Sequence, residues 1–164
     1  MDNYIKDLIH VIRNGSMDNT YKMAWIRSIV EACVLDPSKD VYHFDELAPL
    51  IFGYYWNQTI FFDLQQGPNY LKQPEIYQIV CRSIEKFRSH HGYKPEYYYK
   101  VEDSISFDIS DISAVLKKDV SHRFQNVGGT QYSIYDLDLQ HRTIKIHRPD
   151  LLRDYADILF ELIN

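Results

Sequence analysis

This sequence of 164 residues has few of the residues that mark disulfide-rich or membrane-spanning proteins. It contains only two cysteines, six glycines and six prolines. Cys33 and Cys81 lie inside apolar helical patterns, which favours two reduced, buried thiols over a disulfide. No apolar run approaches the ~20 residues that a membrane-spanning helix needs, and the N-terminus lacks a signal-peptide pattern. We therefore expect a cytoplasmic protein with no membrane contact.

Positive charge is also scarce. The chain has 18 Lys and Arg against 23 Asp and Glu, a formal net charge of −5 with histidine counted as neutral. These totals argue against a strongly basic nucleic-acid module. The charge is uneven, however, because an acidic stretch at 102–111 is followed by a basic one at 117–123. A locally basic face on an acidic protein therefore stays open.

Recognisable catalytic and metal-binding patterns are missing as well. Neither cysteine has a partner two to four residues away, as a zinc site would require. The run "DLDLQH", with Asp136, Asp138 and His141, has metal-ligand character, but aspartates are common in turns and we favour turn chemistry. His90 and His91 point about 100° apart on a helix and do not make a two-ligand pair. No phosphate loop, dinucleotide fingerprint or nucleophile elbow occurs.

Aromatic residues, in contrast, are abundant. The 14 Tyr, 8 Phe and 2 Trp make up 15% of the chain. Such rings fill a core with relatively few residues, and the length suits one domain with a real core. We therefore expect a single, mainly helical domain over residues 1–164.

The apolar spacing predicts most of the helices. A first helix over 2–13 stops at Asn14 and Gly15, and a second begins at Asp18, Asn19 or Thr20 and ends before Pro37. The second carries apolar residues on most of its circumference, so Trp25 is expected in the core. After an extended segment at 41–44, Asp45 is predicted to cap a third helix, and a loop is expected at "DLQQGPN".

The second half of the chain mixes helices with strands. Pro74 starts a helix that runs to Gly92, and residues 92–110 are expected to form a loop or short strand over the core. Asp108 or Ser110 caps the next helix, which extends through Val120. Extended runs at 131–137 and 143–147 predict a β-hairpin, and a last helix runs from Pro149 to the end. The predicted class is α+β, a compact helical domain with a C-terminal hairpin and final helix, in an order that fits a winged helix.

A winged-helix order points to a segment that could contact DNA, "LKKDVSHRFQN". Basic side chains there could reach phosphates, Gln and Asn could reach base edges, and the hairpin could add further cations. The candidate contact residues are Lys117, Lys118, Arg123, Gln125, Asn126, Arg142, Lys145 and Arg148. The simpler interpretation is that these basic residues are merely solvated.

Two other polar or aromatic groups also have two interpretations. Tyr97, Tyr98 and Tyr99 could stack on bases, although covering apolar surface is favoured. The outward face of the fourth helix carries five basic residues that could bind phosphate, although basic residues late in a helix also complement its dipole: Arg82, Lys86, Arg88, His90 and His91.

Three stretches carry a family resemblance. These are "NGSMDNTYKMAWIRSIVEACVLD", "YHFDELAPLIFGYYWNQTIFFDLQQGPNYLKQPEIYQIV" and "TQYSIYDLDLQHRTIKIHRPDLLRDYADILFELIN". They resemble the N-terminal region of bacterial HNH-family endonucleases found among restriction and phage-defence proteins. The resemblance implies the N-terminal domain of a longer protein, which positions DNA or a partner. No catalytic residue carries over, and the resemblance implies a divalent metal only in a nuclease domain absent from this chain.

Three hypotheses follow. The first is this non-catalytic domain of a DNA endonuclease. The second is a free-standing winged-helix-like adaptor that contacts DNA. The third is a protein-interaction or homo-oligomerisation domain that uses exposed aromatic residues.

Overall fold

The computed structural model describes residues 1–17, 19–62 and 73–163. Its helical elements are α1 (Asn3–Asn14), α2 (Asn19–Leu35), α3 (Phe44–Phe62), α4 (Glu75–His91), α5 (Tyr98–Val101), η2 (Glu102–Ser104), α6 (Ile109–Val115), the π-helical turn η3 (Leu116–Val120), α7 (Pro149–Asp154) and α8 (Ala156–Ile163). The strands are β1 (Val41–His43), β2 (Asn126–Val127), β3 (Thr130–Gln131), β4 (Tyr135–Asp138) and β5 (Thr143–Ile146). The predicted α+β, mainly helical class is confirmed.

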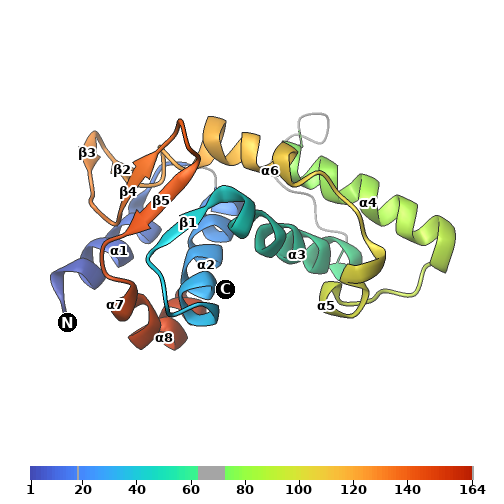
Figure 1. The fold of residues 1–164 in the computed structure, drawn as a ribbon, viewed down its shortest axis with the longest axis horizontal. Helices are drawn as coiled ribbons and strands as arrows, with labels where there is room; N and C mark the ends of the chain where they lie inside the picture. The colour runs from blue at the N-terminus through green and yellow to red at the C-terminus, as the bar shows by residue number, and fades with distance from the viewer. Residues whose placement is uncertain (18, 63–72, 164) are drawn as a thin grey trace.

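Helices α2 and α3 form the centre of the molecule. Helix α2 packs against α3, α7 and α8, and α3 packs in turn against α4 and α6. Figure 1 shows the sheets, α1, α7 and α8 around α2 at one end and α4 with α5 at the other. Trp25 is fully buried, as predicted, and so is Trp56 of α3. Burial of α2 on most sides explains why apolar residues occupy two of its stripes.

Helix α1 ends in a close backbone contact at Gly15. The N–H of Gly15 donates to the carbonyl of Val11 at 3.0 Å, and a Cβ at Gly15 would lie only 2.9 Å from that same oxygen. Glycine is thus required here by close approach. The Nζ of Lys22 donates to the Gly15 carbonyl at 3.2 Å, and burial lowers the pKa of this amine. The predicted cap at Asp18 lies outside the described residues.

The start of α3 differs from the prediction, because Asp45 does not cap it. The helix begins at Phe44, and the Nδ1 of His43 accepts the N–H of Asp45 at 2.9 Å. Glu46 accepts the N–H of His43 at 2.8 Å, which completes a reciprocal capping box with histidine at the N-cap. Asp45 instead accepts a hydrogen bond from the buried Ser113 of α6. The carboxylate therefore ties α3 to α6.

Residues 92–110 contain helical turns, α5 and η2, where a loop or strand was expected. The Nε1 of Trp56 donates to the Glu96 carbonyl at 3.0 Å, and Asn57 accepts the N–H of Tyr98 at 2.9 Å. A Cβ at Gly53 would lie 3.0 Å from the Tyr98 ring, so glycine leaves room for that ring against α3. These long-range contacts set the local conformation, and local sequence did not reveal them.

The predicted hairpin is part of a three-stranded antiparallel sheet. Its strand order is β1-β5-β4, so β5 is the central strand. Lys145 of β5 pairs with Val41 of β1 on one side and with Asp136 of β4 on the other. The run at 131–137 is split, because Gln131 pairs with Asn126 in a separate β2–β3 ribbon. Gly128 and Gly129 both have positive φ and form the turn of that ribbon.

One buried tyrosine joins α2, the end of η3 and the sheet. The Nε1 of Trp25 donates to the Tyr135 hydroxyl at 3.0 Å, and that hydroxyl donates to the Ser121 carbonyl at 2.7 Å. The Tyr135 ring stacks on Phe124 and meets Trp25 edge to face, with centroids 6.4 and 5.9 Å apart. Burial raises the pKa of Tyr135, so the phenol stays protonated and can donate.

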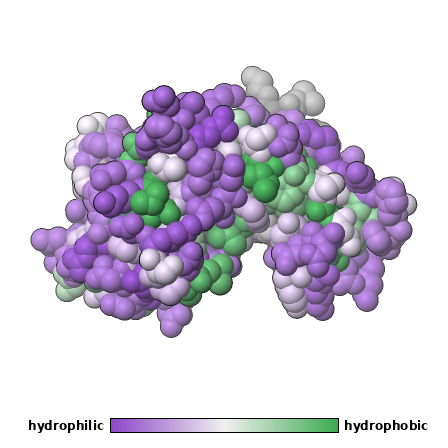
Figure 2. Space-filling model, in the orientation of Figure 1, coloured by the Kyte–Doolittle hydropathy of each residue, from purple (hydrophilic) through white to green (hydrophobic). Residues whose placement is uncertain are grey.

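The C-terminal part and the surface complete the fold. The predicted last helix is divided at Tyr155 into α7 and α8. The loop expected at 63–69 lies outside the described residues. None of the helices described is long and apolar enough to span a membrane. Figure 2 shows hydrophilic residues over most of one face, with hydrophobic residues in small separate patches.

Replacement of Tyr135 by phenylalanine tests the buried connection. Tyr135→Phe leaves the Trp25 N–H and the Ser121 carbonyl without their partner, which should lower the free energy of unfolding by about 1–3 kcal/mol. Urea denaturation followed by circular dichroism measures this loss. Tyr99→Phe, at a ring 68% exposed, is the matched control and should change little. Equal effects of the two variants would contradict the account.

Candidate nucleic-acid interface

The candidate contact residues divide between the end of η3 and the β4–β5 hairpin. Helix α6 starts at Ile109 and is capped, as predicted, by Asp108, whose carboxylate accepts the N–H of Ser110 at 2.9 Å. It continues into η3, where the Ser121 N–H donates to the Leu116 carbonyl five residues earlier at 2.8 Å. Turns of this π type are frequent at functional sites. Figure 1 shows α6 and the tip of the hairpin along the same upper edge of the molecule.

The cations of the η3 segment face carboxylates. The Lys118 Nζ lies 2.9 Å from Glu75 of α4 and 3.9 Å from Asp119. The hydrogen bond with Glu75 raises the pKa of Lys118. Arg123, whose side chain is 58% exposed, lies 3.9 Å from Asp119, and Lys117 is half-buried. Exposed pairs of this kind are weak, so a phosphate could compete for these cations.

A hollow of about 590 Å³ lies beside Arg123 and Asn126. Its other walls come from the α1–α2 turn, from Tyr21 and from η3 and the turn that follows it. Burial raises the pKa of Tyr21 to about 12, so its phenol is neutral at physiological pH. The Asn126 Oδ1 accepts the N–H of Gly129 at 3.1 Å. Asn126 itself is exposed and is the first residue of β2.

Gln125 is not on this surface. The residue is only 4% exposed, and its Oε1 accepts the N–H groups of Ile134 and Tyr135, both at 2.8 Å. In this structure its side chain holds the start of β4 and is not available to read a base. Glutamine is a base-reading residue type, and nothing in the local sequence shows that this amide is buried.

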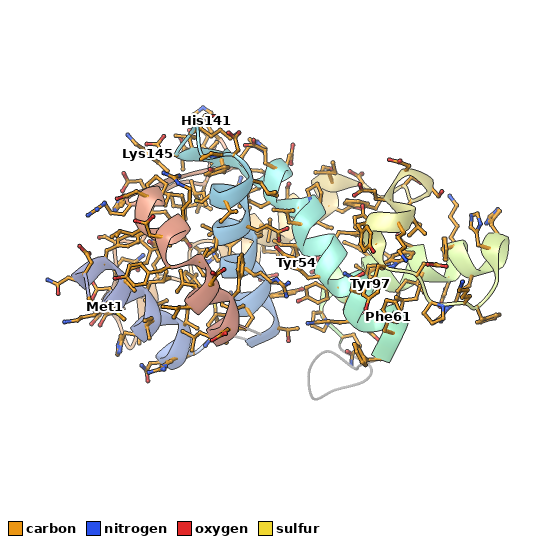
Figure 3. All side chains as sticks on the ribbon, turned by 90° about the horizontal axis from the view of Figure 1, so that it is seen from below. Met1, Tyr54, Phe61, Tyr97, His141 and Lys145 are labelled. Atoms are coloured by element: carbon orange, nitrogen blue, oxygen red, sulfur yellow. The ribbon has the colours of Figure 1, made fainter. Side chains whose placement is uncertain are left out.

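The hairpin carries two of the remaining cations at its turn end. Arg142 has φ 54°, and its carbonyl accepts the N–H of Phe44 at 2.8 Å, which links the turn to the start of α3. Lys145 is exposed on β5. Figure 3 shows Lys145 and His141 close together at this end of the molecule. The structure therefore groups Arg142 with Lys145.

Arg148 lies past the other end of β5. It is six positions along the chain from Arg142, with the four residues of β5 between them, which is about 20 Å at ~3.3 Å per residue. Its guanidinium makes two hydrogen bonds to Asp150, at 3.1 and 2.8 Å, and lies 3.9 Å from Asp2. The bond with Asp150 raises the pKa of Arg148 and lowers that of Asp150. Arg148 thus connects the sheet to α7 and is separate from the turn.

The acidic residues of the hairpin are paired with histidines. In the turn, the N–H of His141 donates to Asp138 at 3.0 Å and the two side chains are 2.7 Å apart, which confirms turn chemistry for "DLDLQH". The contact with His141 lowers the pKa of Asp138. The His147 ring lies 2.7 Å from Asp136. Among the described residues, no group of three or more His, Cys, Asp or Glu side chains could hold a metal ion.

The tyrosines at 97–99 have different environments. Tyr98 packs against Phe52 and Trp56, so this ring covers the core as favoured from the sequence. Tyr97 and Tyr99 are 48% and 68% exposed. The Tyr97 ring lies 4.4 Å from that of Phe61, and Figure 3 shows this pair far from the hairpin. These aromatic residues are therefore separate from the candidate interface.

Comparisons with protein families, with curated proteins and with solved structures find no match to this chain. The chemistry of the surface must be argued from its geometry alone. It offers separated cations, an amide and a hollow along one edge, with carboxylates between them. Such an arrangement can bind a polyanion in a defined orientation.

The structural role of Gln125 gives a second prediction. Gln125→Leu keeps the size of the side chain but leaves two buried backbone N–H groups unpaired, so the free energy of unfolding should fall by about 2–4 kcal/mol. Asn126→Leu, at the exposed neighbouring position, should cost less than half as much. Chemical denaturation of both variants provides the measurement. A Gln125 variant as stable as the wild type would contradict the assignment.

Proposed function

We propose that this chain is a non-catalytic helical domain of a bacterial HNH-type DNA endonuclease. It positions DNA, or a partner, for a nuclease domain outside this chain. The resemblance of 14–36, 42–80 and 130–164 supports this proposal. The supporting structural observation is the sheet order β1-β5-β4, in which the strand between two helices joins the edge of the later hairpin.

That strand order matters because a winged helix has the same arrangement. In this chain α2, β1, α3, α6 with η3, β4 and β5 follow each other in the required sequence, with α4 and α5 inserted after α3. In helix-turn-helix proteins the later helix contacts the major groove, and backbone contacts fix its register. The η3 segment is the corresponding element here, and the hairpin is the wing.

In this proposal the contacts are divided by element. Lys117, Lys118 and Arg123 bind phosphates beside η3, and Asn126 reaches a base edge. Arg142 and Lys145 bind phosphates from the hairpin. Gln125 and Arg148 are left out because one is buried and the other is paired with Asp150. Interspersed carboxylates keep the affinity moderate, which suits a domain that orients DNA. Cys33 and Cys81 form no disulfide in the part of the chain that the structure describes, in keeping with the cytoplasmic location that we propose.

A specific observation favours a second candidate function, protein interaction or self-association. Phe62, Tyr93, Tyr97 and Tyr99 are between 48% and 80% exposed at the end of the molecule remote from the hairpin. Tyrosine and phenylalanine are enriched in interfaces. Light scattering at several concentrations tests self-association, and a concentration-independent monomer would argue against it.

DNA binding tests the first function directly. The chain should bind a duplex at low salt, and the logarithm of its affinity should fall linearly with the logarithm of salt concentration. Arg123→Gln and Lys145→Gln should each reduce that slope by about 1, because each removes one phosphate contact. Fluorescence anisotropy with a labelled duplex between 50 and 200 mM salt gives both quantities.

The control for this experiment is Lys94→Gln. It removes the same charge from a side chain 84% exposed, in the loop after α4 at the other end of the molecule. Its slope should equal that of the wild type. Absence of DNA binding at the lowest salt, or an equal decrease of the salt slope in all three variants, would contradict the proposal.

A further inference from the structure

A second hollow lies at the C-terminal half of α4, at the opposite end of the molecule from the hairpin (Figure 1). Its volume is about 400 Å³, within the range of small-molecule sites. The chain segment after η2 forms the facing wall. The polar lining consists of Lys86, His90 and His91 together with Ser83, Ser104 and Ser106. Three nitrogen groups and three hydroxyls therefore converge from two separate segments.

The nitrogen-bearing side chains of this hollow have no acidic partner in the described part of the chain. Within residues 1–17, 19–62 and 73–163, Lys86, His90 and His91 form no ion pair. An adjoining hollow shares Ser104 and His91 and adds Lys94 and Lys100. The acidic side chain that lines it, Glu96, lies 3.6 Å from Lys94. A cation with no carboxylate beside it keeps its donors available to an anionic ligand.

Both imidazoles are held in place by α4. The Nδ1 of His90 lies 2.9 Å from the Lys86 carbonyl, which can only accept a hydrogen bond. The same Nδ1 lies 3.0 Å from the Ser89 hydroxyl, so the contacts of Nδ1 are made within α4 and Nε2 is the nitrogen left for a ligand. The His91 ring stacks on Phe87 at 4.7 Å with an angle of 26° between the planes. These contacts fix the ring positions before any ligand arrives.

We infer that this hollow binds the phosphate group of a small phosphorylated molecule of nucleotide size. The Lys86 ammonium and the hydroxyls of Ser104 and Ser106 are donors suited to phosphate oxygens, and an imidazole donates from Nε2 when that nitrogen carries a hydrogen. The Ser83 hydroxyl donates to the Ile79 carbonyl at 3.2 Å and can still accept. The hollow is larger than a phosphate group, and Phe87 and Ile105 give it an apolar wall that suits a flat ring. The inference is independent of the proposed DNA contact, because none of these residues belongs to η3 or the hairpin.

Calorimetric titration of the full chain tests this inference with three probes. Adenosine monophosphate should bind, inorganic phosphate should bind more weakly, and adenosine should bind at least tenfold more weakly than the monophosphate. This ranking requires the phosphate to supply much of the affinity and the ring to add to it. Failure of both phosphate-containing probes to bind at 10 mM, or equal affinity for adenosine and its monophosphate, would overturn the inference.

Variants of α4 locate the binding. Lys86→Gln should weaken binding of the monophosphate at least tenfold, since a hydrogen bond to a charged group is lost. Arg82→Gln removes an equal charge from an exposed residue one turn earlier that does not line the hollow, and it should stay within twofold of the wild type. Circular dichroism establishes that both variants are folded. Equal losses in the two variants would show general charge attraction and overturn the site.

Discussion

The structure depends on one polar contact inside its core, the hydroxyl of Tyr135. It accepts from the Trp25 indole of α2 and donates to the Ser121 carbonyl at the end of η3. A buried hydroxyl is costly unless it is hydrogen-bonded, and here both of its partners are also buried. The geometry therefore leaves little freedom in how α2, η3 and the sheet meet. Gln125 reinforces this arrangement, because its side-chain oxygen accepts the N–H groups of Ile134 and Tyr135 at the start of β4.

The buried contacts of Tyr135 and Gln125 explain how the proposed DNA-contacting surface could orient DNA without being strongly basic. Arg123 follows the Ser121 carbonyl by two residues, and Asn126 follows Gln125 directly, so the buried contacts position both. Cations alternate with carboxylates such as Glu75 and Asp119 along the same edge. Under the proposed function, long-range attraction to DNA is weak and the defined spacing of a few contacts carries the recognition.

Local patterns predicted the elements that depend on local signals. The apolar stripes of α2 and α4, the Asp108 cap and the burial of Trp25 followed from spacing and capping chemistry. The His43 cap, the helical turn at α5 and the pairing of β1 with β5 were missed. The helical turn at α5 and the pairing of β1 with β5 depend on partners distant in sequence, such as Gly53 and Asn57 for Tyr98. The His43 cap is local, with Asp45 and Glu46 as its partners, but histidine is not one of the usual N-cap residues. Sequence alone was limited in the same way at the candidate interface. Residue type suggested Gln125 and Arg148 as DNA contacts, whereas Gln125 is buried and Arg148 is paired with Asp150 in the structure.

The most direct test of the central claim maps the DNA contact at residue level. Backbone amide chemical shifts of the full chain, recorded during titration with duplex DNA at low salt, report which segments meet the ligand. The account predicts that shift changes concentrate at 117–126 and 139–145 and leave the C-terminal half of α4 unchanged. Changes confined to α4 and α5, or spread evenly over the surface, would contradict it.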